Sequence, residues 1–328
     1  DMAAMGPRFG ASATPSLADL VVAASRQVEQ AREPGTTVHA AWAGDDAEPR
    51  LGALGGGSDH VGFYGHLGVP SISLGGGGSP GVSYHTNYED LAWYRAVVGE
   101  DYEPARMLTD MVVTVAARLA EADLVPLAPA AYGEEAARRL GALAERWETR
   151  AAAVPEAGAA GTTLHSLAAR AAEVAALAAR ARRRAEAAVA AGSLPPAALA
   201  EAHRALIAAD RAWVDPAGLP GRPWYRNLFA APDATSGYAA WVLPELVEAA
   251  EAGDAAALAT AVARTRAALD RLAAAAAALE AAAAPSAGRA AAPQVRRQPS
   301  SMPERVAQPS SAARAAANAV EPAKGGDD

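Results

Sequence analysis

The stretch DRAWVDPAGLPGRPWYRN occupies residues 210–227, and the organisation of the chain can be worked out from it in both directions. Helical periodicity ends before Pro216, because proline disfavours the helical conformation in the residue that precedes it. The stretch holds three prolines, two glycines, two tryptophans and a tyrosine. This composition predicts a rigid loop that packs against other parts of the protein. An ordinary buried loop is the simpler alternative.

Upstream of residue 127, helical patterns alternate with short apolar segments. We predict a helix over 16–33, with Ser16 as its N-terminal cap, a helical turn over 61–66 and a helix over 104–123. Residues 37–42 and 69–74 are predicted to be extended. This alternation is typical of a mainly parallel sheet flanked by helices, so we expect an α/β domain over residues 1–127.

Downstream of residue 127 the strand patterns vanish and helical stripes remain. Apolar stripes of this kind are buried against each other in a bundle, or against a partner subunit. From residue 285 onward Pro, Ser, Ala, Gln and Gly dominate without periodicity, which is typical of disorder. We therefore predict an all-α domain over 128–284 and a disordered tail over 285–328. The predicted helices lie near 133–150, 161–191, 196–213, 239–252 and 254–284.

The stretch YHTNYED, residues 84–90, is the main candidate for chemistry. It follows an apolar extended segment and a glycine-rich loop over 75–81. Neutral imidazole is the commonest protein ligand for zinc, so His85 is a candidate metal ligand. The hydroxyl of Tyr84 can donate a hydrogen bond to an oxyanion. On spacing alone, a histidine beside a tyrosine in a loop is more often structural.

Composition excludes several classes of function. The net charge is −8 and no basic stripe appears, which argues against nucleic acid as a partner. There is no cysteine, so disulfides and thiol catalysis are excluded. No apolar run is long enough to span a bilayer. The compartment stays undecided, and an exported or periplasmic location is open.

Two parts of the sequence are similar to one protein family. Residues 55–90 resemble the C-terminal part of the peptidase domain in the glutamate carboxypeptidase II and transferrin receptor family. Residues 210–227 resemble the signature of the helical dimerisation domain that follows it, and the whole resemblance covers about residues 1–284. The matching residues upstream are Gly56-Gly57-Ser58-Asp59, Phe63-Tyr64, Leu67-Gly68, the segment 69–74, Tyr84-His85 and Tyr88-Glu89.

The resemblance implies a set of site residues for a paired-zinc exopeptidase. Asp1 and His85 match zinc ligands that serve different ions, although Asp1 read alone is simply a chain terminus. Tyr84 matches the residue that hydrogen-bonds the tetrahedral intermediate. Gly57, Ser58 and Tyr238 match positions that line the substrate pocket.

The same resemblance implies that the other zinc ligands and the general-base glutamate lie upstream of Asp1. We therefore expect the chain to be a C-terminal fragment that is inactive alone and does not retain the two zinc ions of its parent. The alternative is a non-catalytic dimerisation or receptor-like module of the same fold. In either case we expect a homodimer through the helical domain.

The absence of basic residues from two segments bears on which terminal residue of a substrate the protein would recognise. Family members that cut C-terminal glutamate hold its carboxylates with arginines before the Tyr-His pair and with a Lys-Tyr pair downstream. Residues 71–83 contain no Arg or Lys, and Gly237 precedes Tyr238. Bidentate recognition of a carboxylate depends on a guanidinium group. The resemblance therefore implies a peptidase that acts on peptides and is not specific for glutamate.

Overall fold

The computed structural model describes residues 3–81, 83–151 and 158–284. The chain divides into a compact unit of residues 1–287 and a second unit of residues 288–328, so all described residues belong to the first. The predicted tail over 285–328 lies outside the described residues. No helix within the described ranges is both long enough and apolar enough to cross a membrane.

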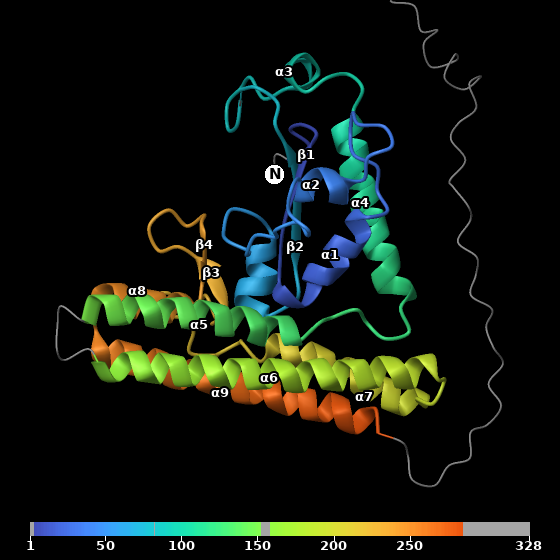
Figure 1. The fold of residues 1–328 in the computed structure, drawn as a ribbon. Coiled ribbons are helices and arrows are strands. Elements are labelled where there is room, and N and C mark those ends of the chain that lie inside the picture. The colour runs from blue at the N-terminus through green and yellow to red at the C-terminus, as the bar shows by residue number, and fades with distance from the viewer. Residues whose placement is uncertain (1–2, 82, 152–157, 285–328) are drawn as a thin grey trace, which may run out of the picture. The chain divides into compact units, whose positions relative to one another are not determined.

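The N-terminal region combines one strand pair with several short helical elements and the longer helix α4 (Figure 1). Strand β1 (Arg8–Ala13) pairs with β2 (Ile72–Gly77) in antiparallel register, from Arg8 opposite Gly77 to Ala13 opposite Ile72. The helix predicted over 104–123 is confirmed as α4. The helical elements are η1 (Pro15–Leu17), α1 (Ala18–Ser25), α2 (Val38–Ala43), the π-helix η2 (Val61–Leu67), α3 (Leu91–Val97) and α4 (Glu103–Glu121).

The described residues do not form the mainly parallel sheet that we expected. Among the described residues of this region, the antiparallel β1–β2 pair is the only sheet, and their parallel contacts are isolated bridges such as Ser12 with Gly52. One cause is that residues 37–42, predicted as a strand, form helix α2 instead. The side chain of Thr37 caps this helix, since its Oγ1 accepts a hydrogen bond from the Ala40 amide at 3.2 Å.

The five helices predicted downstream of residue 127 are confirmed, with shifted ends. Figure 1 shows α5, α6 and α9 running side by side, and α7 packs on α9. A hairpin of two short strands, β3 (Ala230–Pro232) and β4 (Ala240–Val242), was not predicted. The helices are α5 (Ala130–Ala151), α6 (Gly158–Ala190), α7 (Pro196–Arg211), α8 (Pro244–Ala252) and α9 (Ala255–Ala282).

The core joins the two regions. One apolar cluster packs the fully buried Trp213, Tyr132 and Phe229 of the helical region against Leu54 and Tyr64. The other cluster packs α1 and α4 against α7 and against the C-terminal parts of α6 and α9. The helices therefore bury apolar surface of the N-terminal region as well as their own, and the predicted boundary at residue 127 stays a prediction.

A buried carboxylate connects the same regions. Asp210 in α7 is 1% exposed, and its Oδ1 accepts hydrogen bonds from the Ser16 hydroxyl at 2.6 Å and from the Tyr132 hydroxyl at 2.9 Å. Ser16 thus binds α7 instead of capping a helix as predicted. Burial raises the pKa of Asp210 to about 6, although both hydroxyl hydrogen bonds act in the opposite direction.

The raised pKa of Asp210 predicts an unusual dependence of stability on pH. The folded protein holds this proton more tightly than the unfolded chain, in which the pKa is 3.8. The free energy of unfolding should therefore fall as pH rises from about 4 to about 6, by roughly 2–3 kcal/mol. Asp210→Asn is neutral at every pH and should lack this fall.

Urea unfolding of the wild type and the variant between pH 4 and pH 8 measures the effect, and their difference isolates Asp210 from other titrating groups. Asp45→Asn, which changes an exposed carboxylate, is the control. A difference between wild type and Asp210→Asn that stays constant across this range would contradict the prediction.

Candidate functional site

A tight turn presents Tyr84 and His85 at the surface. The Ser83 carbonyl accepts hydrogen bonds from the Thr86 amide at 3.0 Å and from the Thr86 hydroxyl at 2.7 Å. His85 has a φ of 58°, in the left-handed region that non-glycine residues seldom adopt. Its ring stacks on Tyr84 with centroids 3.7 Å apart, and its amide donates to Glu89 Oε2 at 3.3 Å. The turn therefore holds the two candidate rings together.

A run of three glycines lies against the loop of the β3–β4 hairpin. The Gly56 amide donates to the Tyr238 carbonyl at 2.9 Å. A Cβ at Gly56 would lie 1.8 Å from the Gly237 carbonyl oxygen, and one at Gly55 would lie 2.1 Å from the Tyr238 oxygen. Gly57 has a φ of 83°, and a Cβ there would lie 2.6 Å from the Tyr238 ring. Only glycine permits this approach.

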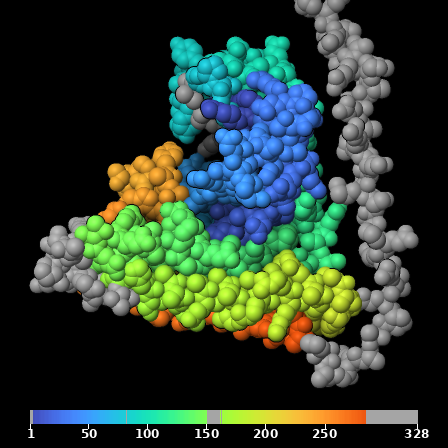
Figure 2. All heavy atoms as spheres, in the orientation of Figure 1, coloured from blue at the N-terminus to red at the C-terminus, as the bar shows by residue number. Residues whose placement is uncertain are grey.

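The structure brings together three of the predicted site residues. Gly57 contacts the Tyr238 ring, and the side chains of Tyr238 and Tyr84 interact. Desolvation, followed by the neighbouring Tyr238, raises the pKa of Tyr84. Figure 2 shows the orange surface of the β3–β4 hairpin beside the blue surface of the N-terminal region. Tyr84 is 37% exposed and Tyr238 is 59% exposed, so both rings line an accessible surface.

The remaining predicted site residues are Ser58, His85 and Asp1, of which the structure describes the first two. Ser58 is exposed, and its carbonyl accepts the Val61 amide at 3.1 Å where η2 begins. Asp1 lies outside the described residues. Among the residues with described positions, no group of three His, Asp or Glu side chains could hold a metal ion. His85 is therefore a single candidate ligand, and the described residues alone do not make a zinc site.

The loop over 213–227 packs against η2 and the start of the hairpin, in keeping with the packed loop that its composition predicted. The amides of Arg226 and Asn227 donate to the Gly65 carbonyl at 2.8 and 3.0 Å. Buried Asn227 donates through Nδ2 to the Tyr64 carbonyl at 3.2 Å and accepts the Phe229 amide at 2.8 Å. The loop thereby ties η2, which follows the glycine run, to the start of the hairpin.

Sequence reasoning missed the residue that shapes the hairpin loop. Asp233 is 7% exposed, and its carboxylate accepts hydrogen bonds from Thr235, Ser236, Tyr238 and Ala239. These bonds, led by the Ser236 hydroxyl, hold the pKa of Asp233 well below its usual range. The signal was present in the sequence PDATSG, which is typical of a turn built around an aspartate.

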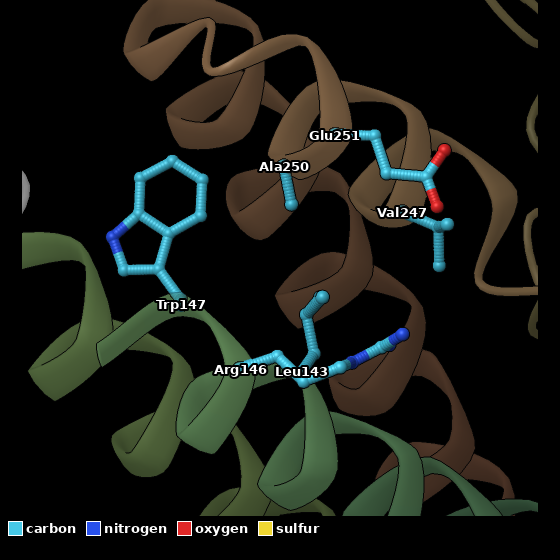
Figure 3. Close-up of a pocket in the computed structure, with 6 residues that line it drawn as sticks. All are labelled: Leu143, Arg146, Trp147, Val247, Ala250 and Glu251. Carbon is cyan, nitrogen blue, oxygen red and sulfur yellow. The ribbon is translucent and has the colours of Figure 1, made fainter. Parts of the chain in front are cut away.

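A separate small pocket lies between α5 and α8 (Figure 3). Its volume is about 160 Å³, and it shares no residue with the surface around Tyr84 and Tyr238. Figure 3 shows the Trp147 indole on α5 at one side and the short side chain of Ala250 at the other. The pocket is lined by Leu143, Arg146, Trp147, Val247, Ala250 and Glu251.

Comparison with known proteins gives a consistent result. Residues 159–277 match the transferrin receptor-like dimerisation domain family. The chain is 27% identical over 251 residues to a protein of Arabidopsis thaliana named "Probable glutamate carboxypeptidase LAMP1", covering 76% of this chain and 34% of that protein. It is 26% identical over 262 residues to a "Probable glutamate carboxypeptidase" of Arthroderma benhamiae, covering 77% and 34%. The chain spans about a third of the length of these curated relatives.

A substitution in the glycine run tests the contact between that run and the loop of the β3–β4 hairpin. Gly56→Ala would push a methyl group into the Gly237 carbonyl, so we expect the free energy of unfolding to fall by about 1–3 kcal/mol. Gly141→Ala is the matched control, because a Cβ at that helical position has no neighbour within 4 Å. The control should raise stability by roughly 0.5–1 kcal/mol. Urea unfolding measures both, and an unchanged midpoint for Gly56→Ala would refute the close approach.

Proposed function

Because the chain belongs to the glutamate carboxypeptidase II and transferrin receptor family, we propose that it forms the C-terminal part of an exopeptidase. In this proposal it supplies one wall of the substrate cleft and a helical dimerisation domain. The observation that carries the proposal is the meeting of Tyr84, Gly57 and Tyr238, which lie far apart in the sequence. The parallel-sheet peptidase domain, of which residues 1–127 would be the end, is part of the same proposal.

Tyr84 would stabilise the oxygen that gains charge when water attacks the peptide bond. Its raised pKa keeps the hydroxyl protonated, so it remains a hydrogen-bond donor at neutral pH and above. Gly57 and Tyr238 would bind the substrate beside it, with Ser58 at the exposed rim.

The activity of the whole protein would depend on zinc. Two zinc ions would supply a metal-activated water, as in other paired-metal hydrolases. The exposed imidazole of His85 beside Tyr84 fits the role of one ligand, and Asp1 would serve the other ion. One ligand per ion is too few for tight binding, since zinc takes about four. The 328 residues alone should therefore be inactive.

The substrate would carry a neutral residue at the recognised position. Neither residues 71–83 nor the Gly237-Tyr238 pair offers a cation that could hold a terminal glutamate side chain. The names of the curated relatives refer to glutamate carboxypeptidases, so this specificity would be a departure from them.

Peptide hydrolysis by the full-length protein that contains this chain tests the proposal. We expect kcat/KM to be higher for a peptide ending in leucine than for its glutamate counterpart. Tyr84→Phe should lower kcat by about 10²-fold with little change in KM, because its hydroxyl acts on the transition state. Tyr88→Phe, in the same loop and 76% exposed, is the control. Full activity in Tyr84→Phe, or a tenfold preference for glutamate, would contradict us.

A non-catalytic dimerisation or receptor-like module is the second candidate. It is favoured by the family match, which covers the dimerisation domain over 159–277 and not a peptidase domain. No hydrolysis by the full-length zinc-loaded protein, together with a stable dimer, would decide for this module.

In both cases we propose that the helical domain mediates homodimerisation. Ile207 is an exposed large apolar side chain on α7, within the matched range, with 43% of its surface accessible. Charge at such a position opposes burial in an interface, where apolar contacts dominate. Ile207→Asp should therefore raise the dimer dissociation constant of the full-length protein at least about tenfold, or roughly 1.4 kcal/mol.

Light scattering over a dilution series measures this constant. Val112→Asp on α4 is the control, because Val112 is equally apolar, is exposed and lies outside the matched range. A monomeric wild type at micromolar concentration would refute the dimer. Dimers that tolerate Ile207→Asp would place the interface on another face.

A further inference from the structure

The loop between β3 and β4 is built around the Asp233 carboxylate. Residues 233–239 carry Tyr238 at an exposed position, yet Asp233 itself is 7% exposed. An exposed loop of this length loses much conformational entropy when it adopts one shape. Hydrogen bonds to an ionised carboxylate are stronger than those between neutral groups, and they can hold such a loop in a single conformation.

The two carboxylate oxygens have different tasks. Oδ1 accepts the amides of Thr235 at 2.9 Å and Ser236 at 2.6 Å, which closes the first turn of the loop. Oδ2 accepts the amides of Tyr238 at 3.2 Å and Ala239 at 2.9 Å, together with the Ser236 hydroxyl. Oδ2 therefore fixes the backbone on either side of the Tyr238 Cα atom.

Fixing this backbone also fixes contacts with distant parts of the chain. The Tyr238 carbonyl accepts the Gly56 amide, the ring covers Gly57, and the side chain reaches Tyr84. Asp233 acts on this surface through Tyr238.

We propose that Asp233 is a positioning residue that holds Tyr238 against Gly57 and Tyr84, so that the two tyrosine rings form an apolar wall for an aromatic or aliphatic substrate side chain. This inference rests on the proposed peptidase function for its substrate class. The geometric part, that Asp233 positions Tyr238, does not depend on catalysis. The rings supply flat apolar surface, and Gly237 beside Tyr238 carries no charge that could attract an acidic side chain.

Amide hydrogen exchange in the 328-residue chain tests the geometric part. Asp233→Asn replaces one oxygen by an amide nitrogen, which cannot accept the loop amides. The Gly56 amide, bonded to Tyr238, should then exchange at least tenfold faster. Ser236→Ala removes one hydroxyl and leaves both carboxylate oxygens, so it should change this rate less than threefold. The Ala13 amide, bonded to the Gly52 carbonyl, reports whether the fold is intact.

Kinetics of the full-length protein test the specificity part. Asp233→Asn should raise KM for a peptide with a phenylalanine side chain at least fivefold and change kcat less than twofold. The preference for phenylalanine over alanine should shrink accordingly, while Ser236→Ala retains it. Unchanged Gly56 exchange in Asp233→Asn would overturn the positioning role. Faster exchange with unaltered preference would overturn the apolar wall.

The two proposals fail in different ways. If the wild-type protein hydrolyses no peptide, the proposed function fails, and with it the substrate class inferred for the tyrosine pair. The exchange rate of Gly56 still decides whether Asp233 positions Tyr238.

Discussion

The buried carboxylate of Asp210 is the constraint on which the junction of the two regions depends. A carboxylate in an apolar core is costly unless its oxygens accept hydrogen bonds. Here the partners come from separate elements, Ser16 in η1 and Tyr132 in α5, while Asp210 lies in α7. Both hydroxyls donate to Oδ1, while the buried Oδ2 has no hydrogen-bond partner among the described residues. Loss of either hydroxyl would leave the carboxylate with a single hydrogen bond, so the two bonds favour one relative arrangement of the three elements.

That arrangement extends from the core to the surface around Tyr84 and Tyr238 through the chain that follows α7. Trp213 is fully buried against Tyr132 and Phe229, and the Trp213 carbonyl accepts the Leu228 amide at 2.9 Å. Asn227 then bonds to η2, whose first turn follows the glycine run. The steps are aromatic contacts and hydrogen bonds to the backbone, so the position of the surface around Tyr238 depends on the packing of the core.

Periodicity predicted the long elements well and the short ones poorly. The stripe Met107, Leu108, Met111 and Val115 predicted α4, because apolar residues at three- and four-residue steps form one continuous face on a helix. Residues 37–42 were mistaken for a short strand or extended segment, since six residues are too few to separate the two periods and Thr37 was not recognised as a cap. The three-residue strands of the hairpin are shorter than any pattern that periodicity can detect.

The candidate site was predicted by resemblance and not by spacing. Nothing in the local sequence indicates that Gly57 meets Tyr238, because the contact depends on the tertiary packing of the hairpin. Asp233 could have been recognised as a turn former from PDATSG, but its link to Tyr84 passes through that same tertiary contact. Asp1 lies outside the described residues, so the metal-ligand part of the prediction stays a prediction.

The hairpin that carries Tyr238 is fastened to the helices of the dimerisation domain. Arg222 donates to the Pro232 carbonyl at 2.5 Å and pairs with Glu248 of α8, so the residue before Asp233 is tied to that helix. Arg264 of α9 binds Glu245 of α8 at 2.7 Å and the Gly218 carbonyl at 2.6 Å. These arginine contacts are partly buried, where ion pairs are screened less by salt than at the surface. A displacement of α8 relative to α9 would therefore move Pro232 and, through Asp233, Tyr238. The packing of α8 on α9 and the position of Tyr238 are thus linked within one chain.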